Sequence, residues 1–311
     1  MRKFSEMNIG DDVIFNALVE SLQKRFTPNK KAYYSLSLTD GETIIDARVW
    51  DEGLVEKNEV CAGEVYAFEA HINEYAGKMQ YVVRNIQKVM DDVDVSQFYR
   101  TAPLSKEYLK NSIKEYIQKI DNSVLRQVVI ELIANVKDEF FEYPAAMSMH
   151  HNYQYGLMHH TLSMLKIADT CIDLYPNINK SLLYSGVLIH DVGKTKELSK
   201  VHSPVYTQEG NLLGHIVIGL QMLAVVANKL QVEETEEVKM LEHMLASHHG
   251  ELEWGSPKEP GILEAYALHY IDLMDSKLAA LNPEVSKTQK GSSTGPIGSI
   301  NRKCLYVPDI E

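Results

Sequence analysis

The strongest constraint on the fold is a change of hydrophobic period near residue 92. Between about residues 12 and 89, apolar and polar side chains alternate, and β-branched and aromatic residues lie between turn signals, which is typical of strands. Beyond Asp94 the apolar residues recur at helical spacing as far as residue 281. The sequence therefore predicts an α+β multidomain protein with a β domain over residues 1–92, a helical domain over 93–282 and a tail over 283–311.

The first part is expected to contain five strands. They are predicted at residues 13–24, 32–38, 43–50, 65–73 and 78–89. The interval between the third and fourth strands has room for a short helix. This arrangement suggests a small closed five-stranded β-barrel of the OB type, with a generic five-stranded sheet as the alternative. Trp50 and Phe68 are expected in the core of this domain.

The second part is expected to be all-α. Helices are predicted at residues 104–120, 123–140, 156–174, 180–190, 215–230, 233–248 and 259–281. Asn282 and Pro283 are expected to stop the last helix, because proline cannot continue a helix interior. The tail after them has no periodicity and is expected to be irregular.

Composition limits the partners and the compartment. The chain has 31 Lys and Arg against 43 Asp and Glu, a formal net charge of −12, which argues against coating nucleic acid through bulk positive charge. No stretch is apolar and long enough to cross a bilayer, so no membrane partner is expected. Three cysteines without a CxxC motif indicate reduced thiols in a cytoplasm. The apolar stretch at residues 125–136 fits a homo-oligomer interface as well as a domain core.

Histidines and aspartates recur beside the predicted helix ends in a fixed order. The series is His160, His190, Asp191, His215, His248 and Asp272. Any one histidine on an apolar face is more often structural, but the complete series indicates metal ligands. Imidazole with carboxylate suits Mn, Fe, Co or Zn, and Asp191 has two oxygens with which to bridge two ions. Two divalent ions about 3.5–4 Å apart promote phosphodiester hydrolysis.

These residues carry a resemblance to a known superfamily. His160, His190 with Asp191, and Asp272 match the pattern of HD metal-dependent phosphohydrolases, and His215 and His248 resemble the added ligands of its two-metal members. The segments around them, such as His-Asp-Val-Gly-Lys from His190, are similar to those of the bacterial YhaM-type exoribonucleases, which join an OB-type domain to an HD domain. The resemblance implies hydrolysis of single-stranded RNA, and to a lesser degree single-stranded DNA, from the 3′ end, with manganese favoured.

The resemblance also implies roles for individual residues. His160, His190, Asp191 and Asp272 would hold the first ion, and Asp191, His215 and His248 the second. Lys194 matches the lysine of the family's HDxGK segment, where its ammonium would act in catalysis beside Asp191 by neutralising a phosphate oxygen. A solvated lysine at a helix end is the alternative interpretation of Lys194.

For several residues near the predicted ligands, the sequence leaves more than one role possible. Adjacent helix positions point about 100° apart, so only one of His159 and His160, and one of His248 and His249, should face the metals. The resemblance favours His160, and His248 is the choice for the second pair. Asp275 would either accept a hydrogen bond from a ligand histidine or pair elsewhere on its helix. His150 and His151 would contact phosphate or orient water, or else lie in a plain surface loop.

The barrel domain has candidate residues for binding a single strand. Such barrels stack nucleic-acid bases on exposed aromatic rings, and their cationic side chains line a groove that follows the phosphates. The candidates are Lys24, Arg25, Lys30, Lys31 and Tyr33 on one hairpin and Tyr75 on a later one. A solvated lysine-rich turn and tyrosines in a strand core are the alternatives.

The chain is thus expected to be a metal-dependent 3′-to-5′ exoribonuclease that releases nucleoside monophosphates. One alternative is an HD phosphohydrolase of a small cyclic or polyphosphate nucleotide, although such a substrate needs no stacking platform. Another is a non-catalytic regulatory protein that binds single-stranded nucleic acid, although every expected ligand position is filled.

Overall fold

The fold is described from a computed structural model of the chain, over residues 3–75, 77–89, 93–146, 151–199 and 204–310. The chain forms two compact units, one built from residues up to Thr101 and the other from most of the rest. Phe98, in the 3₁₀ turn η2 (Val95–Phe98), is buried against Leu18 and Val65 of the first unit. This contact explains why the first unit extends beyond the expected boundary at residue 92.

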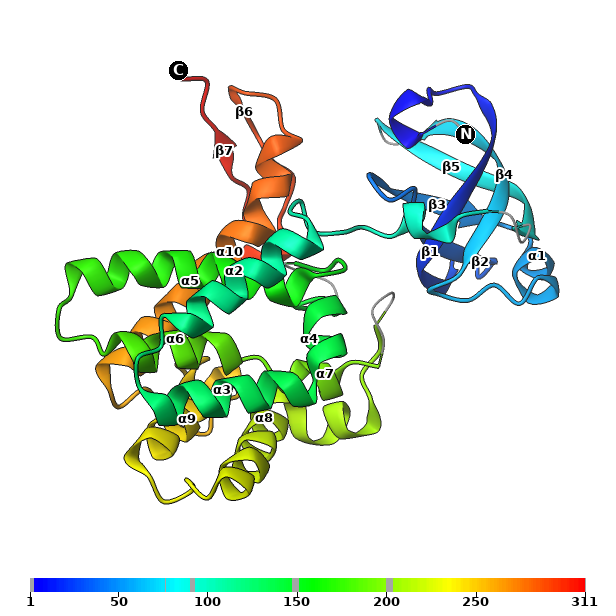
Figure 1. Ribbon diagram of the computed structural model, residues 1–311. Coiled ribbons are helices and arrows are strands. Elements are labelled where there is room, and N and C mark those ends of the chain that lie inside the picture. The colour runs from blue at the N-terminus through cyan, green and yellow to red at the C-terminus, as the bar shows by residue number, and fades with distance from the viewer. Residues whose placement is uncertain (1–2, 76, 90–92, 147–150, 200–203, 311) are drawn as a thin grey trace. The chain divides into compact units, whose positions relative to one another are not determined.

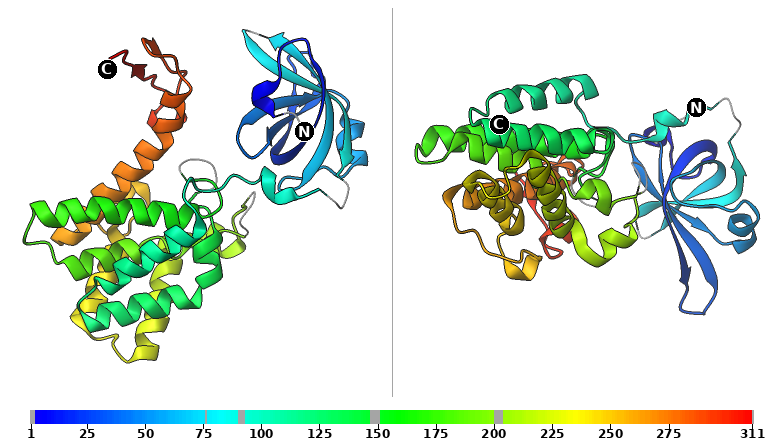
Figure 2. Two further views of the ribbon diagram at one scale, coloured as in Figure 1. Left: turned by 45° about the horizontal axis from the view of Figure 1, so that its top comes forward. Right: turned by 60° about the horizontal axis from the view of Figure 1, so that its bottom comes forward.

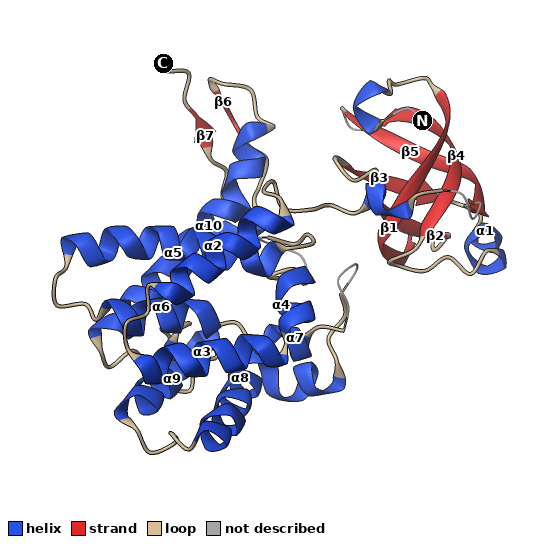
Figure 3. Cartoon of the chain, in the orientation of Figure 1, coloured by secondary structure: helices blue, strands red, loops and turns tan. Residues whose placement is uncertain are grey.

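The first unit is a closed barrel of five strands (Figures 1 and 3). The strands are β1 (Asp12–Phe26), β2 (Ala32–Thr39), β3 (Ile44–Val49), β4 (Val65–Tyr75) and β5 (Lys78–Lys88), and they follow the order β1-β2-β3-β5-β4 around the barrel. Pairing of β1 with β4 closes the barrel, and β3 pairs with β5 in parallel. The short helix α1 (Glu52–Lys57) follows β3. The predicted OB-type architecture is confirmed.

Side chains alternate between the inside and the outside of the barrel along each strand, and the inward-facing apolar side chains fill its interior. Phe15 and Phe68 are buried and stack with their ring centroids 5.6 Å apart. Phe4, in the 3₁₀ turn η1 (Phe4–Glu6), covers Phe15 edge-on. The core position expected for Trp50 is wrong: the residue follows the last paired position of β3, and 37% of its surface is exposed. A residue beyond the ladder is not held to the inward face by pairing.

The second unit is helical (Figure 2). Its helices are α2 (Lys106–Gln118), α3 (Ser123–Asn135), α4 (Lys137–Glu142), α5 (Gly156–Leu174), α6 (Lys180–Ile189), α7 (Lys194–Glu197), α8 (Gln208–Leu230), α9 (Glu236–Ser247) and α10 (Leu263–Ser286). The residues of α6 from Ser181 to Ile189 are all buried, because this helix is apolar on every side and packs against α3, α5, α9 and α10. The C-terminal end of α6 therefore delivers the residues that follow it into the interior.

Several helix boundaries differ from the prediction. The single helix expected at residues 123–140 breaks at Val136, which separates α3 from α4 with φ −130° and ψ 29°. Helix α8 begins at Gln208, ahead of its expected start, and contains a kink at Gly214. The expected stop at Pro283 is wrong, because α10 continues to Ser286. Proline removes one main-chain donor, but the next turn closes with Lys287 N–H donating to Pro283 O at 3.3 Å.

The tail after α10 is more regular than expected. Short strands β6 (Ser292–Ser293) and β7 (Tyr306–Val307) pair in antiparallel fashion, with the 3₁₀ turn η4 (Gly298–Ile300) between them. Thr294 N–H donates to Leu305 O at 2.8 Å and supports the same hairpin. These hydrogen bonds join residues that are more than ten positions apart in the tail. The spacing of apolar residues along the sequence therefore could not predict them.

Two apolar helices belong to the core of the second unit. The expectation that no stretch is apolar and long enough to cross a bilayer is wrong by length and composition for helix α8, although core helices pass the same test. It is kinked at Gly214, and Leu223 is among its buried residues in the central core cluster. In α3, Val128 and Leu132 are buried in the same cluster. The core therefore accounts for the apolar pattern of α3 that also fitted a homo-oligomer interface.

Candidate metal centre

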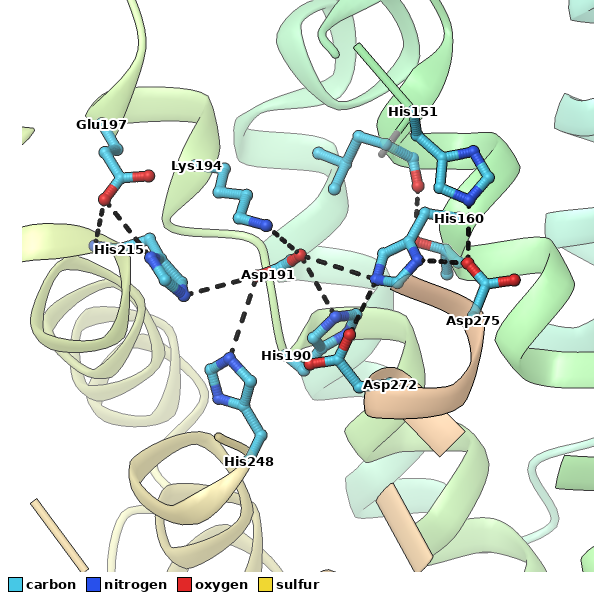
Figure 4. A network of polar contacts seen from close by, with 12 residues as sticks. His151, His160, His190, Asp191, Lys194, Glu197, His215, His248, Asp272 and Asp275 are labelled. Carbon is cyan, nitrogen blue, oxygen red and sulfur yellow. Dashed lines mark hydrogen bonds and ion pairs between the residues drawn. The ribbon is translucent and has the colours of Figure 1, made fainter. Parts of the chain in front are cut away.

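Different helices bring the predicted ligands to one place (Figure 4). Helix α5 carries His160, α8 carries His215 and α10 carries Asp272, whereas His190 and His248 lie at the C-terminal ends of α6 and α9. Asp191 follows His190 and is 4% exposed. A buried carboxylate surrounded by imidazoles is therefore the centre of the arrangement.

The two oxygens of Asp191 face different groups of side chains. Its Oδ2 lies 3.2 Å from His190 Nε2 and 3.8 Å from His160 Nε2. Asp272 joins this side, with Oδ1 3.2 Å from His160 Nε2. The Asp191 Oδ1 atom lies 3.5 Å from His215 Nε2 and 3.9 Å from His248 Nε2. One carboxylate therefore spans two clusters of nitrogen and oxygen atoms, as Figure 4 shows.

The hydrogen bonds of the rings define which nitrogen faces Asp191. His190 Nδ1 lies 2.9 Å from Val187 O, and His248 Nδ1 lies 2.8 Å from Leu245 O. A carbonyl only accepts, so each Nδ1 carries the hydrogen and, in the neutral ring, Nε2 carries a lone pair. In the described part of the chain, the buried Nε2 atoms of His190, His215 and His248 have no hydrogen-bond partner. Lone pairs directed at a carboxylate are the arrangement that a cation between them stabilises.

The charge states of His248 and Asp191 suit a divalent metal. Burial lowers the pKa of His248 well below its usual value, and the neighbouring His249 and His190 lower it further. Burial opposes ionisation of Asp191, but Lys194 and His190 outweigh it and hold the pKa of the carboxyl well below its usual range. Neutral imidazole and ionised carboxylate are the forms that bind a metal. The donor set therefore fits the borderline divalent ions predicted from the sequence.

A second ring of carboxylates orients two of the histidines. Asp275 Oδ2 lies 2.7 Å from His160 Nδ1. Glu197 Oε1 lies 3.3 Å from His215 Nδ1 and also accepts the His215 main-chain N–H at 2.9 Å. Such partners fix the tautomer and direction of a ligand histidine. Glu197 is not among the residues predicted from the sequence, because its role depends on the path of the chain around Gly214.

Two glycines permit this path. Gly214 has φ 72°, a left-handed conformation that interrupts α8 and releases the N–H of His215 from the helical ladder to Glu197. A Cβ at Gly193 would lie 2.0 Å from His215 O, so only glycine lets α7 approach α8 this closely. The glycine in the His-Asp-Val-Gly-Lys segment is thus a packing requirement of the centre.

Lys194 contacts the centre directly. Its Nζ lies 2.7 Å from Asp191 Oδ2, and 13% of its side chain is exposed. Burial disfavours its charge, but Asp191 outweighs burial and raises the pKa of the ammonium. Lys194 lies on a different helix from the residues before His190, because α6 ends at Ile189 and Lys194 begins α7.

The neighbouring histidines differ in what they contact. His249 lies beyond the end of α9, so the 100° separation does not apply, and its ring offers a ligand atom within 4.8 Å of those of His215 and His248. The prediction that only one of His248 and His249 faces the centre is therefore wrong. His159 instead pairs with Tyr153, Nδ1 to Oη 2.7 Å, and burial lowers its pKa to about 4.

The remaining histidine predictions concern the loop before α5. His151 is 6% exposed, and its Nε2 lies 2.8 Å from Asp275 Oδ2. Because the ring is buried and supports Asp275, His151 does not lie in a surface loop, and its contact with phosphate stays a prediction. His150 lies outside the described residues.

Comparisons with known proteins agree with this geometry. The HD domain family matches residues 157–277. A 3′-5′ exoribonuclease YhaM from Listeria welshimeri is 37% identical, with 100% of this chain and 99% of the relative covered. The YhaM exoribonuclease of Bacillus subtilis is 36% identical over 96% of each chain. This chain belongs to the YhaM family of exoribonucleases.

One solved structure has a weaker likeness to this YhaM-family chain. A mitochondrial single-stranded DNA-binding protein from S. cerevisiae is 17% identical, with a TM-score of 0.24 over 28% of this chain and 100% of that chain. The OB assignment rests on the strand order of the barrel, and this likeness adds nothing to it.

The barrel of this YhaM-family chain carries a cationic aromatic group on one face. Tyr33 and Trp50 lie with their ring centroids 4.9 Å apart. Arg48 lies over the Tyr33 ring at 5.7 Å, and Lys31 lies over the Trp50 ring at 5.5 Å. Arg25 pairs with Tyr33 across β1 and β2, and directly paired residues share a face. We call Arg25, Lys31, Tyr33, Arg48 and Trp50 the barrel patch.

Other residues predicted to bind the strand lie apart from the barrel patch. Lys24 pairs with Tyr34 across the ladder, lies over its ring at 5.7 Å and forms an ion pair with Glu52. Successive residues of a strand point to opposite faces, so Lys24 faces away from Tyr33, and its contact with a nucleic-acid strand stays a prediction. Lys30 is exposed in the β1–β2 turn, and Tyr75 is 70% exposed beside the β4–β5 turn.

We expect the Asp275→Asn variant to lose about 10- to 100-fold in metal affinity or activity, because an amide no longer holds the His160 ring as a charged acceptor. Metal affinity by calorimetry and the rate of RNA hydrolysis measure the effect. Glu284→Gln, an exposed change on the same helix, is the control. Equal affinities for the two variants would show that Asp275 does not orient His160.

Proposed function

We propose that this protein hydrolyses single-stranded RNA from the 3′ end to nucleoside 5′-monophosphates at a two-metal centre in its helical unit. The observation that carries the proposal is the Asp191 carboxylate, whose two oxygens face two separate groups of ligand atoms. Membership of the YhaM family supports RNA as the substrate and the 3′ end as the point of attack.

The residues present would hold two divalent ions, with manganese favoured. One site would use His160, His190, Asp191 and Asp272, and the other Asp191, His215 and His248, with His249 as a further candidate. When bound, such ions polarise phosphoryl oxygens and activate water. The Lys194 ammonium beside Asp191 adds a positive charge for a phosphate oxygen of the substrate. Asp275 and Glu197 keep the ligand rings in place.

The barrel patch supports delivery of a polymer. OB barrels bind single strands on the face of strands 2 and 3 and with the turns between strands 1 and 2 and between strands 4 and 5. Tyr33, Arg48 and Trp50 lie on or beside β2 and β3. Lys30 and Tyr75 lie in or beside the two turns. This agreement favours RNA, and single-stranded DNA as a second substrate, over a small nucleotide.

The test of the proposal is the product pattern from 5′-labelled single-stranded RNA. With manganese we expect a ladder that shortens one nucleotide at a time and stops when the 3′ end carries a phosphate block. Intact RNA together with hydrolysis of a cyclic or polyphosphate nucleotide would assign the centre to a small substrate. RNA binding without turnover of any substrate would assign the chain to a regulatory role.

We expect Trp50→Ala to raise KM for a long single-stranded RNA about 5- to 100-fold, because stacking of a base on an aromatic ring contributes about 1–3 kcal/mol. The kcat should change much less, since Trp50 belongs to the barrel unit and the ligands to the helical unit. Ile14→Ala, which removes another exposed apolar side chain of the barrel, is the control. Equal KM values for the two variants would contradict a binding role for the barrel patch.

The proposed activity places the protein in the cytoplasm. Cys61, Cys171 and Cys304 are free thiols. Free cysteines are typical of proteins kept in a reducing compartment, which supports this location.

A further inference from the structure

A cavity of about 420 Å³ lies beside the metal centre within the helical unit. Lys194, His248 and Asp272 form part of its wall, so the cavity adjoins the atoms that face Asp191. Pockets of about 300–1,000 Å³ accommodate small organic groups, and a single nucleoside is a small member of that class. A nucleoside whose phosphate is bound at the metal centre could therefore occupy this cavity.

An exposed aromatic ring lines the same cavity. Trp254 ends the 3₁₀ turn η3 (Leu252–Trp254) and is 52% exposed. Its main-chain O accepts the Nδ1–H of His249 at 2.8 Å, which ties the turn to the metal side of the cavity. An indole with an open face beside a phosphate-binding centre is the feature on which a base stacks.

The C-terminal segment contributes a polar part of the wall. Ser299, in η4, and Lys277, on α10, both line the cavity, and Lys277 Nζ donates to Ser299 O at 2.8 Å. In the described part of the chain, the buried Ser299 Oγ has no hydrogen-bond partner. Leaving a buried hydroxyl unpaired is unfavourable, and the hydroxyl groups of a ribose are partners of the right kind.

We propose that this cavity binds the nucleoside at the 3′ end of the substrate, with its base stacked on Trp254 and its sugar hydroxyls toward Ser299 and Lys277. This proposal rests on the exoribonuclease function proposed above. In the reaction, the oxygen of water bonds to phosphorus and the bond from phosphorus to the 3′ oxygen of the preceding nucleotide breaks. That oxygen takes a proton to become the new 3′ hydroxyl, and a nucleoside 5′-monophosphate leaves the cavity.

Two substitutions at Trp254 test the stacking. We expect Trp254→Ala to raise KM for RNA about tenfold or more, with a smaller change in kcat, and Trp254→Phe to retain most of the wild-type affinity. The inhibition constant of the product AMP should rise by a similar factor in Trp254→Ala. Leu252→Ala, an exposed apolar change in the same turn and outside the cavity wall, is the control. Equal KM and inhibition constants for Trp254→Ala and Leu252→Ala would overturn the proposal.

A binding measurement separates this proposal from the catalytic one. The chain has two tryptophans, so Trp50→Phe leaves Trp254 as the sole indole fluorophore. Adding AMP to this variant with manganese should quench and shift the fluorescence of Trp254, whether or not the enzyme degrades RNA. Unchanged fluorescence at AMP concentrations that inhibit RNA hydrolysis would overturn the assignment of the cavity. Absence of RNA hydrolysis by the wild-type chain, with quenching retained, would instead contradict the exoribonuclease function alone.

Discussion

Replacing Asp191 by asparagine is expected to reduce RNA hydrolysis on the order of a thousandfold or more. The side chain has the same shape, but the neutral amide presents one oxygen where the carboxylate presents two. The Nε2 atoms of His190 and His215 would then no longer share a charged partner. Loss of activity should be accompanied by weaker manganese binding, which calorimetry measures directly.

The control for this variant must separate chemistry from folding. Asp191 also pairs with the largely buried Lys194, and leaving a buried charge without its partner destabilises a protein by about 3–5 kcal/mol. Circular dichroism and thermal unfolding should therefore be compared with those of Asp173→Asn, an exposed change on α5. A second variant, Asp191→Asn with Lys194→Met, removes the unpaired ammonium. A folded variant that retains wild-type RNA hydrolysis would rule out the bridging role of Asp191.

Much of the fold follows from hydrophobic period, and the exceptions arise where distant contacts set a boundary. The bounds expected for α5 match those observed, because its apolar stripe is continuous from Gly156 to Leu174. Pro283 failed as a stop signal because it falls in the last turns of α10, where one lost donor is tolerated. Trp50 failed as a core residue because the register of β2 and β3 ends before it. The local spacing of apolar residues determines neither the pairing register of two strands nor the length of a helix.

The candidate ligand residues could be predicted from the sequence, whereas the residues that contact them could be predicted less well. Residue type and order were enough to select His190, Asp191 and Asp272, because imidazole and carboxylate on separate helices indicate a metal. The contact of Glu197 with His215 requires the left-handed turn at Gly214. The approach of His249 requires α9 to end at Ser247. Both depend on how the backbone turns at one residue, which spacing in the sequence does not specify.

Removing divalent metal should abolish hydrolysis and loosen the helical unit while leaving the barrel unchanged. Three buried Nε2 atoms face a carboxylate, so a bound cation relieves an unfavourable contact that exists only in the folded state. A ligand at 100 times its Kd stabilises the folded state by about 2.7 kcal/mol. For a unit of this size the expected rise in Tm on adding manganese to chelated protein is roughly 5–10 °C.

Hydrogen exchange can show where this stabilisation acts. Manganese should slow exchange around the ends of α6 and α9 and along α10, which carry His190, His248 and Asp272. Exchange in β1 and β4 should not change, because the barrel contributes none of the ligands. The Asp191→Asn variant should lose most of this protection, whereas Asp173→Asn should keep it. Equal slowing in both units, or none in either, would mean that the metal does not bind where the buried imidazoles converge, because only occupancy of that centre links their unpaired nitrogens to local stability.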